Sequence, residues 1–168
     1  MVNTACFTGH RPNKLNGYNP KDNSELLFKL RDIIIDHIEN KEVVTFISGM
    51  ALGVDMWASR IVLKLKETYP HIRLLCAIPC DKQYSKWFES SIKEYHDICA
   101  KADEIYYVSK EPYNNYCMFN RDKWMVDRSD FVIGVYDGSK SGTGHTINYA
   151  RKLEKEIITL HPKTLEIK

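Results

Sequence analysis

Three polar, glycine-bearing stretches contain the residue types from which an anion-binding or acid–base site could be built. Glycine lets the chain turn sharply and lets a ligand come close to backbone N–H groups. A histidine, an arginine and two aspartates add groups that titrate or carry charge, and the arginine fork suits phosphate or carboxylate. The candidate ligand-binding residues in these stretches are Thr8, Gly9, His10, Arg11, Ser48, Gly49, Gly53, Asp55, Asp137, Gly142, Thr143, Gly144 and Thr146.

Each of these stretches follows an apolar run that is typical of a buried strand. The runs are Val2–Phe7, Val43–Ile47 and residues 130–136. Apolar residues at helical spacing then predict a helix over 53–68 after the second stretch and another over 147–155 after the third. A strand, a tight turn and a helix form the layout by which α/β proteins present backbone N–H groups to an anion.

Strands and helices alternate along the rest of the chain as well. This alternation predicts an α/β protein with a three-layer Rossmann-like fold, in which helices cover both faces of a mostly parallel central sheet. Because ligands of such sheets bind at the carboxyl ends of the strands, we expect the three polar stretches to converge on one edge. The remaining strands are expected over 72–78, 105–108 and 157–160, and the remaining helices over 24–40, 81–100 and 120–128.

Three further residues are candidates because of where they fall in this pattern. Trp87 belongs to an aromatic stripe that fits core packing, but it lies near a strand end, where ligands collect. Asn120 and Arg121 follow the loop 111–119, which is rich in aromatic and amide side chains. Such a loop can stack on a ring and hydrogen-bond its edge, or it can pack as a lid.

The composition limits the class of protein. A length of 168 residues fits a single domain, 1–168, and a net charge of +2 gives no strongly basic surface that would require nucleic acid. The sequence has no apolar run long enough for a membrane span and no secretion signal, so we expect a cytoplasmic protein. Its five cysteines form no CxxC pair, so we expect reduced thiols and no metal site.

Two familiar phosphate-binding motifs are absent from the sequence. There is no GxxxxGK[ST] loop, and no GxGxxG follows the first expected strand, so standard NAD-dependent hydride transfer is not indicated. If the protein is an enzyme, His10 and Asp55 could form an acid–base pair, provided that their loops meet.

Four motifs, in this order, resemble the YpsA-like proteins of the SLOG superfamily, a bacterial and phage group related to the LOG and DprA Rossmann-type domains. The motifs are TGHR at 8–11, GMALGVDMWA at 49–58, NRDKWMVDRSD at 120–130, and Tyr136-Asp137 followed by Gly142-Thr143. The resemblance covers essentially the whole chain. It implies a Rossmann-like domain whose strand-end glycines bind a nucleotide or a nucleotide-derived ligand such as an ADP-ribose derivative.

The resemblance also bears on individual positions. Gly53 and Asp55 match a pair in the pocket of the family, and Gly142-Thr143 matches the end of the LOG phosphate motif PGGxGTxxE. The sequence departs from that motif at 138–140, where LOG enzymes have Pro-Gly-Gly, and at Thr146, where they have the catalytic glutamate. A hydroxyl cannot replace a carboxylate that activates water, so the departure argues against LOG-type N-glycosidase activity.

The main hypothesis is therefore a domain that binds or senses a nucleotide or ADP-ribose-like ligand, with stress, cell-division or phage-related signalling implied by the family. The alternative is a nucleotide-processing hydrolase, a LOG-like N-glycosidase or a phosphohydrolase, that uses Asp55 and His10. The expected partner is a small-molecule nucleotide. DNA binding by analogy with DprA is disfavoured, because the net charge is only +2 and no helix is rich in Arg and Lys. The oligomeric state is left open, with a homo-oligomer among the alternatives.

Overall fold

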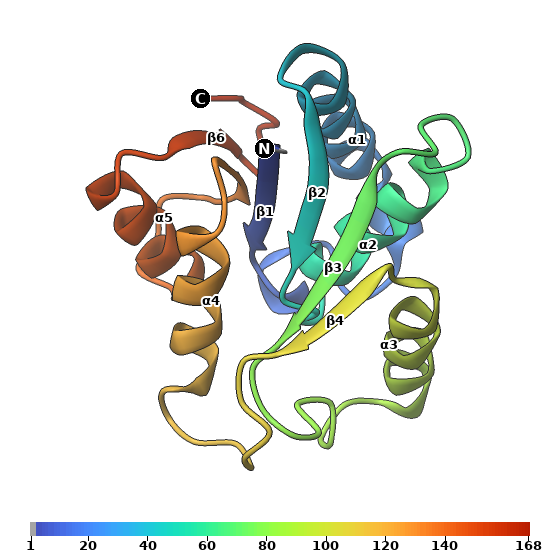
Figure 1. Cartoon of the computed structure of the whole chain (residues 1–168), viewed down its shortest axis with the longest axis vertical. Helices are drawn as coiled ribbons and strands as arrows, with labels where there is room; N and C mark the ends of the chain where they lie inside the picture. The colour runs from blue at the N-terminus through green and yellow to red at the C-terminus, as the bar shows by residue number, and fades with distance from the viewer. Residues whose placement is uncertain (1–2) are drawn as a thin grey trace.

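A six-stranded parallel sheet forms the centre of the molecule (Figure 1). The structure is a computed structural model that describes residues 3–168, so Val2, expected in the first strand, lies outside the described residues. All five strand pairings are parallel, and the strand order is β4-β3-β2-β1-β5-β6. The strands are β1 (Asn3–Gly9), β2 (Val43–Ser48), β3 (Arg73–Ile78), β4 (Glu104–Tyr107), β5 (Phe131–Val135) and β6 (Glu156–Leu160).

Helices cover both faces of this sheet, which confirms the three-layer α/β fold predicted from the alternation of elements (Figure 1). The first three helices contact one another in sequence order and pack on one face, and the last two pack together on the other face. Two short 3-10 turns, Pro12–Lys14 and Pro20–Asn23, lie between β1 and the first helix. The helices are α1 (Ser24–Asn40), α2 (Val54–Leu65), α3 (Glu89–Lys101), α4 (Cys117–Asp127) and α5 (Gly142–Lys152).

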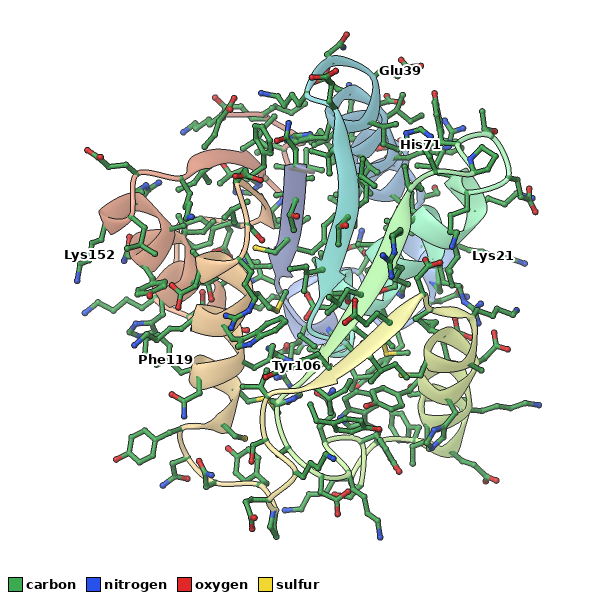
Figure 2. The ribbon with its side chains drawn as sticks, in the orientation of Figure 1. Lys21, Glu39, His71, Tyr106, Phe119 and Lys152 are labelled. Atoms are coloured by element: carbon green, nitrogen blue, oxygen red, sulfur yellow. The ribbon has the colours of Figure 1, made fainter. Side chains whose placement is uncertain are left out.

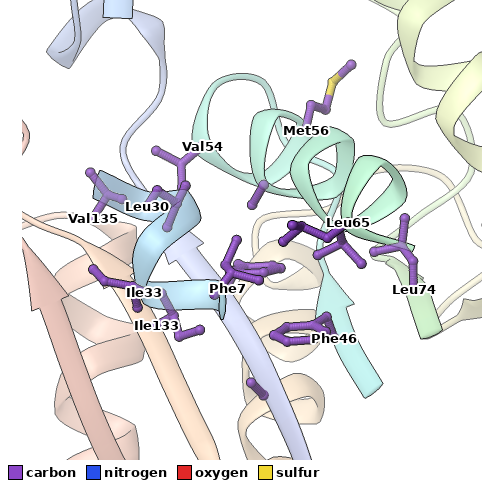
Figure 3. Packing of buried hydrophobic residues seen from close by; sticks show 14 of the residues in the cluster. Phe7, Leu30, Ile33, Phe46, Val54, Met56, Leu65, Leu74, Ile133 and Val135 are labelled. Carbon is purple, nitrogen blue, oxygen red and sulfur yellow. The ribbon is translucent and has the colours of Figure 1, made fainter. Parts of the chain in front are cut away.

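The larger hydrophobic core lies between the sheet and helices α1 to α3 (Figure 3). Phe7 of β1 stacks on Phe46 of β2 with ring centroids 5.8 Å apart, and Leu30 of α1 is fully buried nearby. A buried side chain of this size contributes about 1.5–3 kcal/mol by leaving water. The central strands are therefore anchored in this core, and the loops at their carboxyl ends begin at its edge.

The strand order changes direction between β1 and β5. From β1 the chain builds outward through β2, β3 and β4, and then crosses back so that β5 pairs with the other side of β1. In open α/β sheets this reversal leaves a crevice between the loops after the two strands, which is the preferred place for a ligand. Here those loops are residues 10–11 and 136–141.

Four of the five helices differ in extent from the sequence prediction. Helix α2 ends at Leu65 and not at 68, and α4 begins at Cys117 and not at 120, so the last three residues of the expected loop 111–119 are helical. The helix expected over 81–100 begins only at Glu89, because Lys82 has a φ of 50° and residues 81–87 form turns instead. The helix expected from Ile147 already begins at Gly142, where Ser141 caps it. No helix within residues 3–168 is both long enough and apolar enough to cross a membrane.

Candidate functional site

A cleft of about 230 Å³ opens at the switch point between β1 and β5. It is lined by all three parts of the chain that the sequence singled out: the loop after β1, the start of α2 and the start of α5. Helix α4 supplies the remaining wall. The lining residues are Phe7, Thr8, Gly9, His10, Arg11, Asn13, Lys14, Ala51, Asp55, Met118, Arg121, Asp122, Ser141, Gly142 and Thr143.

The N-terminus of α5 supplies hydrogen-bond donors to this cleft. The Ser141 hydroxyl accepts a hydrogen bond from the Gly144 N–H (3.0 Å), which caps the helix. Among the described residues, none accepts a hydrogen bond from the N–H groups of Gly142 and Thr143. These free donors lie at the positive end of the helix dipole, so this wall of the cleft favours an anion.

Two cations stand on the rim beside those donors. The Lys14 ammonium donates to the Ser139 hydroxyl (2.9 Å), which holds it against the loop before α5. Arg11 is exposed and lines the cleft from the loop after β1. Together with the helix terminus, they form an electropositive side of the cleft that matches a phosphate group.

Glycines let the loops interlock closely behind this wall. A Cβ on Gly9 would lie 2.5 Å from Cβ of Val54, the first residue of α2. Gly53 has a φ of 90°, and a Cβ there would lie 2.8 Å from the His10 carbonyl oxygen, which accepts a hydrogen bond from the Val54 N–H (3.4 Å). These two glycines therefore fix the β1 loop against the start of α2.

His10 is bound to the β5 side of the cleft. Its Nε2 lies 3.1 Å from the backbone nitrogen and 3.0 Å from a carboxylate oxygen of Asp137. Burial lowers the pKa of His10, although the Asp137 carboxylate partly opposes this effect. The ring is therefore neutral at neutral pH, and Nε2 accepts a hydrogen bond from the Asp137 N–H.

Asp55 lies at the floor of the cleft and is almost completely buried. Its carboxylate accepts a hydrogen bond from the Ala51 N–H (3.3 Å), and its backbone carbonyl accepts one from the Ser48 hydroxyl (3.0 Å). Burial raises the pKa of Asp55 to about 6, Arg121 lowers it, and the Asp122 carboxylate raises it further. Asp55 therefore titrates near neutral pH, in the range useful for proton transfer.

A second carboxylate enters the cleft from α4. Asp122 accepts hydrogen bonds from Arg121 Nε (2.7 Å) and from the Thr146 hydroxyl (3.2 Å). Arg121 is itself buried, donates to the Gly49 carbonyl, and would collide with any side chain placed at Gly49. The Thr146 hydroxyl thus contacts a carboxylate that comes from another helix.

The structure does not bring every predicted residue into the cleft. Trp87 lines a separate hollow, and Asn120 is exposed on α4. Gly144 lines a separate hollow between the loop before α5 and the first turns of that helix. Ser48 and Gly49 act behind the cleft, where they hold Asp55 and Arg121 in place.

Seven residues that line the cleft were not among the candidates from the sequence, namely Phe7, Asn13, Lys14, Ala51, Met118, Asp122 and Ser141. Lys14 lies in a 3-10 turn within a stretch that looked like an unstructured polar loop. Asp122 directly follows the candidate Arg121, and this adjacency was the one signal that could have identified it. Within residues 3–168, no group of three or more His, Cys, Asp or Glu side chains is arranged to hold a metal ion.

Comparison with known sequences finds a family and its relatives. The model of the YspA SLOG family (YpsA) matches residues 5–165. A UPF0398 protein of Halalkalibacterium halodurans is 38% identical over 112 residues, which are 66% of this chain and 59% of that protein. The uncharacterized SPbeta prophage-derived protein YoqJ of Bacillus subtilis is 36% identical over 155 residues, covering 81% of this chain and 90% of that protein.

Two solved structures share the fold. DNA processing protein A from Helicobacter pylori, described for its single-stranded DNA binding mode, has a TM-score of 0.63 at 20% identity over 96% of this chain. DNA processing protein A (DprA) from Streptococcus pneumoniae has a TM-score of 0.65 at 15% identity over 95% of this chain. The chain spans 66% and 50% of the length of these two proteins.

One of these two structures contradicts the prediction about partners. The sequence reasoning expected a small-molecule nucleotide and disfavoured nucleic acid, whereas one of the matching folds is described by how it binds single-stranded DNA. That expectation rested on the net charge of +2 and on the lack of a helix rich in Arg and Lys. Single strands are bound by local cations and exposed aromatic rings, which the charge of the whole chain does not reveal.

Proposed function

The chain belongs to the YspA SLOG family, and we propose that its switch-point cleft binds single-stranded DNA. In this proposal a backbone phosphate lies on the N-terminus of α5, and neighbouring bases stack on exposed aromatic rings. The observation that carries the proposal is the pair of free N–H donors at Gly142 and Thr143, with Arg11 and Lys14 on the same rim.

Aromatic and basic side chains on α4 and α5, the two helices that contribute to the wall of the cleft, support base stacking. Phe119 on α4 is 41% exposed, and Figure 2 shows its ring pointing outward from the helix. The Lys123 ammonium lies 5.6 Å from the Phe119 ring centroid and 5.3 Å from that of Tyr149 on α5. Stacking on one such ring contributes about 1–3 kcal/mol per base and tolerates any sequence.

The comparison with known folds supports the same ligand. The Helicobacter pylori protein is described as binding single-stranded DNA, and its fold matches 96% of this chain. The five cysteines are free thiols, which fits our further proposal that the protein works in the cytoplasm.

The proposal is tested by fluorescence anisotropy with a labelled oligothymidine at several salt concentrations. The double variant Arg11→Gln/Lys14→Gln should bind at least ten-fold more weakly, and its log–log salt slope should fall by about 1.4, since each phosphate contact on a single strand contributes about 0.7. Lys29→Gln is the matched control, because Lys29 is an exposed lysine on α1, away from the cleft. Equal affinity of the double variant and the control would contradict the proposal.

A second candidate function is hydrolysis of a base–sugar bond in the bound strand, favoured by the two carboxylates that flank Arg121. An anion-binding cleft gains nothing from Asp55 and Asp122 in its floor, whereas hydrolysis of a base–sugar bond can use two carboxyl groups for proton transfer. One carboxylate would take a proton from the attacking water, and a protonated one would give a proton to the departing base. His10 is bound to Asp137, so Asp122 replaces it in this scheme.

Release of free base from an oligonucleotide, followed by chromatography, tests this second function. Asp55→Asn and Asp122→Asn should each abolish release while DNA binding persists. Absence of any released base from a panel of the four homopolymers would exclude the glycosidase and leave the binding proposal intact.

A further inference from the structure

A second hollow adjoins the switch-point cleft on the side away from α5. It has a volume of about 300 Å³, and it shares Arg11 and Asn13 with the cleft. Any extended ligand that leaves the cleft past these two residues therefore enters this hollow next. The other lining residues are Pro12, Tyr18, Leu52, Lys86, Trp87 and Phe88.

Two exposed aromatic rings stand at this hollow. Tyr18 is 53% exposed and Phe88 is 66% exposed, and the two rings pack edge to face with their centroids 5.5 Å apart. They come from segments separated by 70 residues, so their pairing is a product of the fold and not of local sequence. Large aromatic side chains that remain this exposed while lining a concave surface commonly mark a binding surface.

Trp87 and two cations complete the surroundings of this pair. Trp87 is half-buried and packs edge-on against Tyr95 of α3, with ring centroids 5.8 Å apart. Lys86 and Arg11 are both exposed. Aromatic rings interleaved with cations form the combination that binds single strands, in which bases stack on rings and phosphates pair with charges.

We propose that this hollow is a second nucleotide subsite, in which a base stacks on the Tyr18–Phe88 pair while Arg11 contacts the phosphate between the two subsites. This inference rests on the proposed function and adds the path that the bound strand follows across the surface. The strand runs from the N-terminus of α5, past Arg11 and Asn13, to the turn before α3. Trp87 lines this hollow and not the cleft, so the second subsite also places Trp87 next to the bound strand.

Binding measured against strand length tests the second subsite. Anisotropy competition with unlabelled oligothymidines from two to twelve nucleotides should show wild-type affinity rising as the strand grows long enough to reach both subsites. Tyr18→Ala/Phe88→Ala should bind the twelve-nucleotide strand at least ten-fold more weakly and the two-nucleotide strand as well as the wild type does. Phe28→Ala is the control, because Phe28 is 69% exposed on α1 and lines neither hollow.

The outcomes separate this inference from the proposed function. If the wild type binds no strand of any length, the proposed function itself fails. If the wild type binds and the double variant matches Phe28→Ala at every length, the second subsite is wrong and the first stands. The second subsite is also wrong if the double variant loses the same affinity for the two-nucleotide strand as for the twelve-nucleotide strand. It is wrong, too, if the wild type is a dimer and the double variant is a monomer with unchanged DNA affinity.

Discussion

Replacing Asp55 by asparagine should make the protein more stable at neutral pH. The pKa of Asp55 is raised from 3.8 to about 6, mainly because the carboxylate is buried, so its ionised form is penalised in the folded state. This shift corresponds to about 3 kcal/mol of destabilisation once the pH is well above the folded pKa, and to none below about pH 3.8. Asparagine carries no charge and can still accept the Ala51 N–H hydrogen bond.

Urea unfolding followed by tryptophan fluorescence at pH 4, 6 and 7.5 measures this effect. The advantage of Asp55→Asn should be near zero at pH 4 and should rise toward about 3 kcal/mol at pH 7.5, or roughly 6–12 °C in Tm for a chain of this size. Asp137→Asn should change the stability in the opposite direction, because hydrogen bonds from Ser139 lower the pKa of Asp137. That variant should lose stability about equally at pH 6 and 7.5, and the loss should shrink only below about pH 3.8, where the unfolded carboxyl takes up a proton. A pH-independent difference for Asp55→Asn, or a loss of stability at pH 7.5, would refute this reasoning.

Two further substitutions test the positioning of the cleft. Gly9→Ala should destabilise the protein by about 1–3 kcal/mol, because the new methyl group would overlap Val54, and adding Val54→Ala should recover part of that loss in a double-mutant cycle. Ser141→Ala removes the cap of α5 and should lower the stability by about 1 kcal/mol, measured by thermal unfolding. The same variant should bind DNA more weakly. A gain in DNA affinity would argue against a phosphate at the N-terminus of α5.

The layered fold could be predicted from the sequence because its signals are local and strong. The apolar runs at Val43–Ile47 and 130–136 and their alternation with helical spacing leave few alternatives to a parallel sheet. Helix starts were harder to place. Tyr84 and Trp87 keep the helical spacing although they lie in turns, since both rings pack against Tyr95 from outside the helix. The first turn of α5 is polar and is defined by the Ser141 cap, which apolar spacing cannot reveal.

The site could be predicted only at the level of loops. Their convergence follows from the topology, whereas the pairing of side chains depends on packing between distant segments. His10 is bound to Asp137 because β1 and β5 are neighbours, and nothing near His10 in the sequence indicates this. Asp122 meets Thr146 because α4 packs on α5, so a carboxylate from another helix lies beside the position where LOG enzymes have glutamate.

Whether the cleft binds a DNA strand can be measured by anisotropy of a labelled single-stranded oligothymidine in low salt, with free mononucleotide as competitor. We predict saturable binding that weakens steeply with salt. Excess mononucleotide should displace the strand poorly, and Arg11→Gln/Lys14→Gln should bind the strand at least ten-fold more weakly than Lys29→Gln does. If the wild type does not bind the strand, or if stoichiometric mononucleotide displaces it fully, the cleft is not a site for single-stranded DNA.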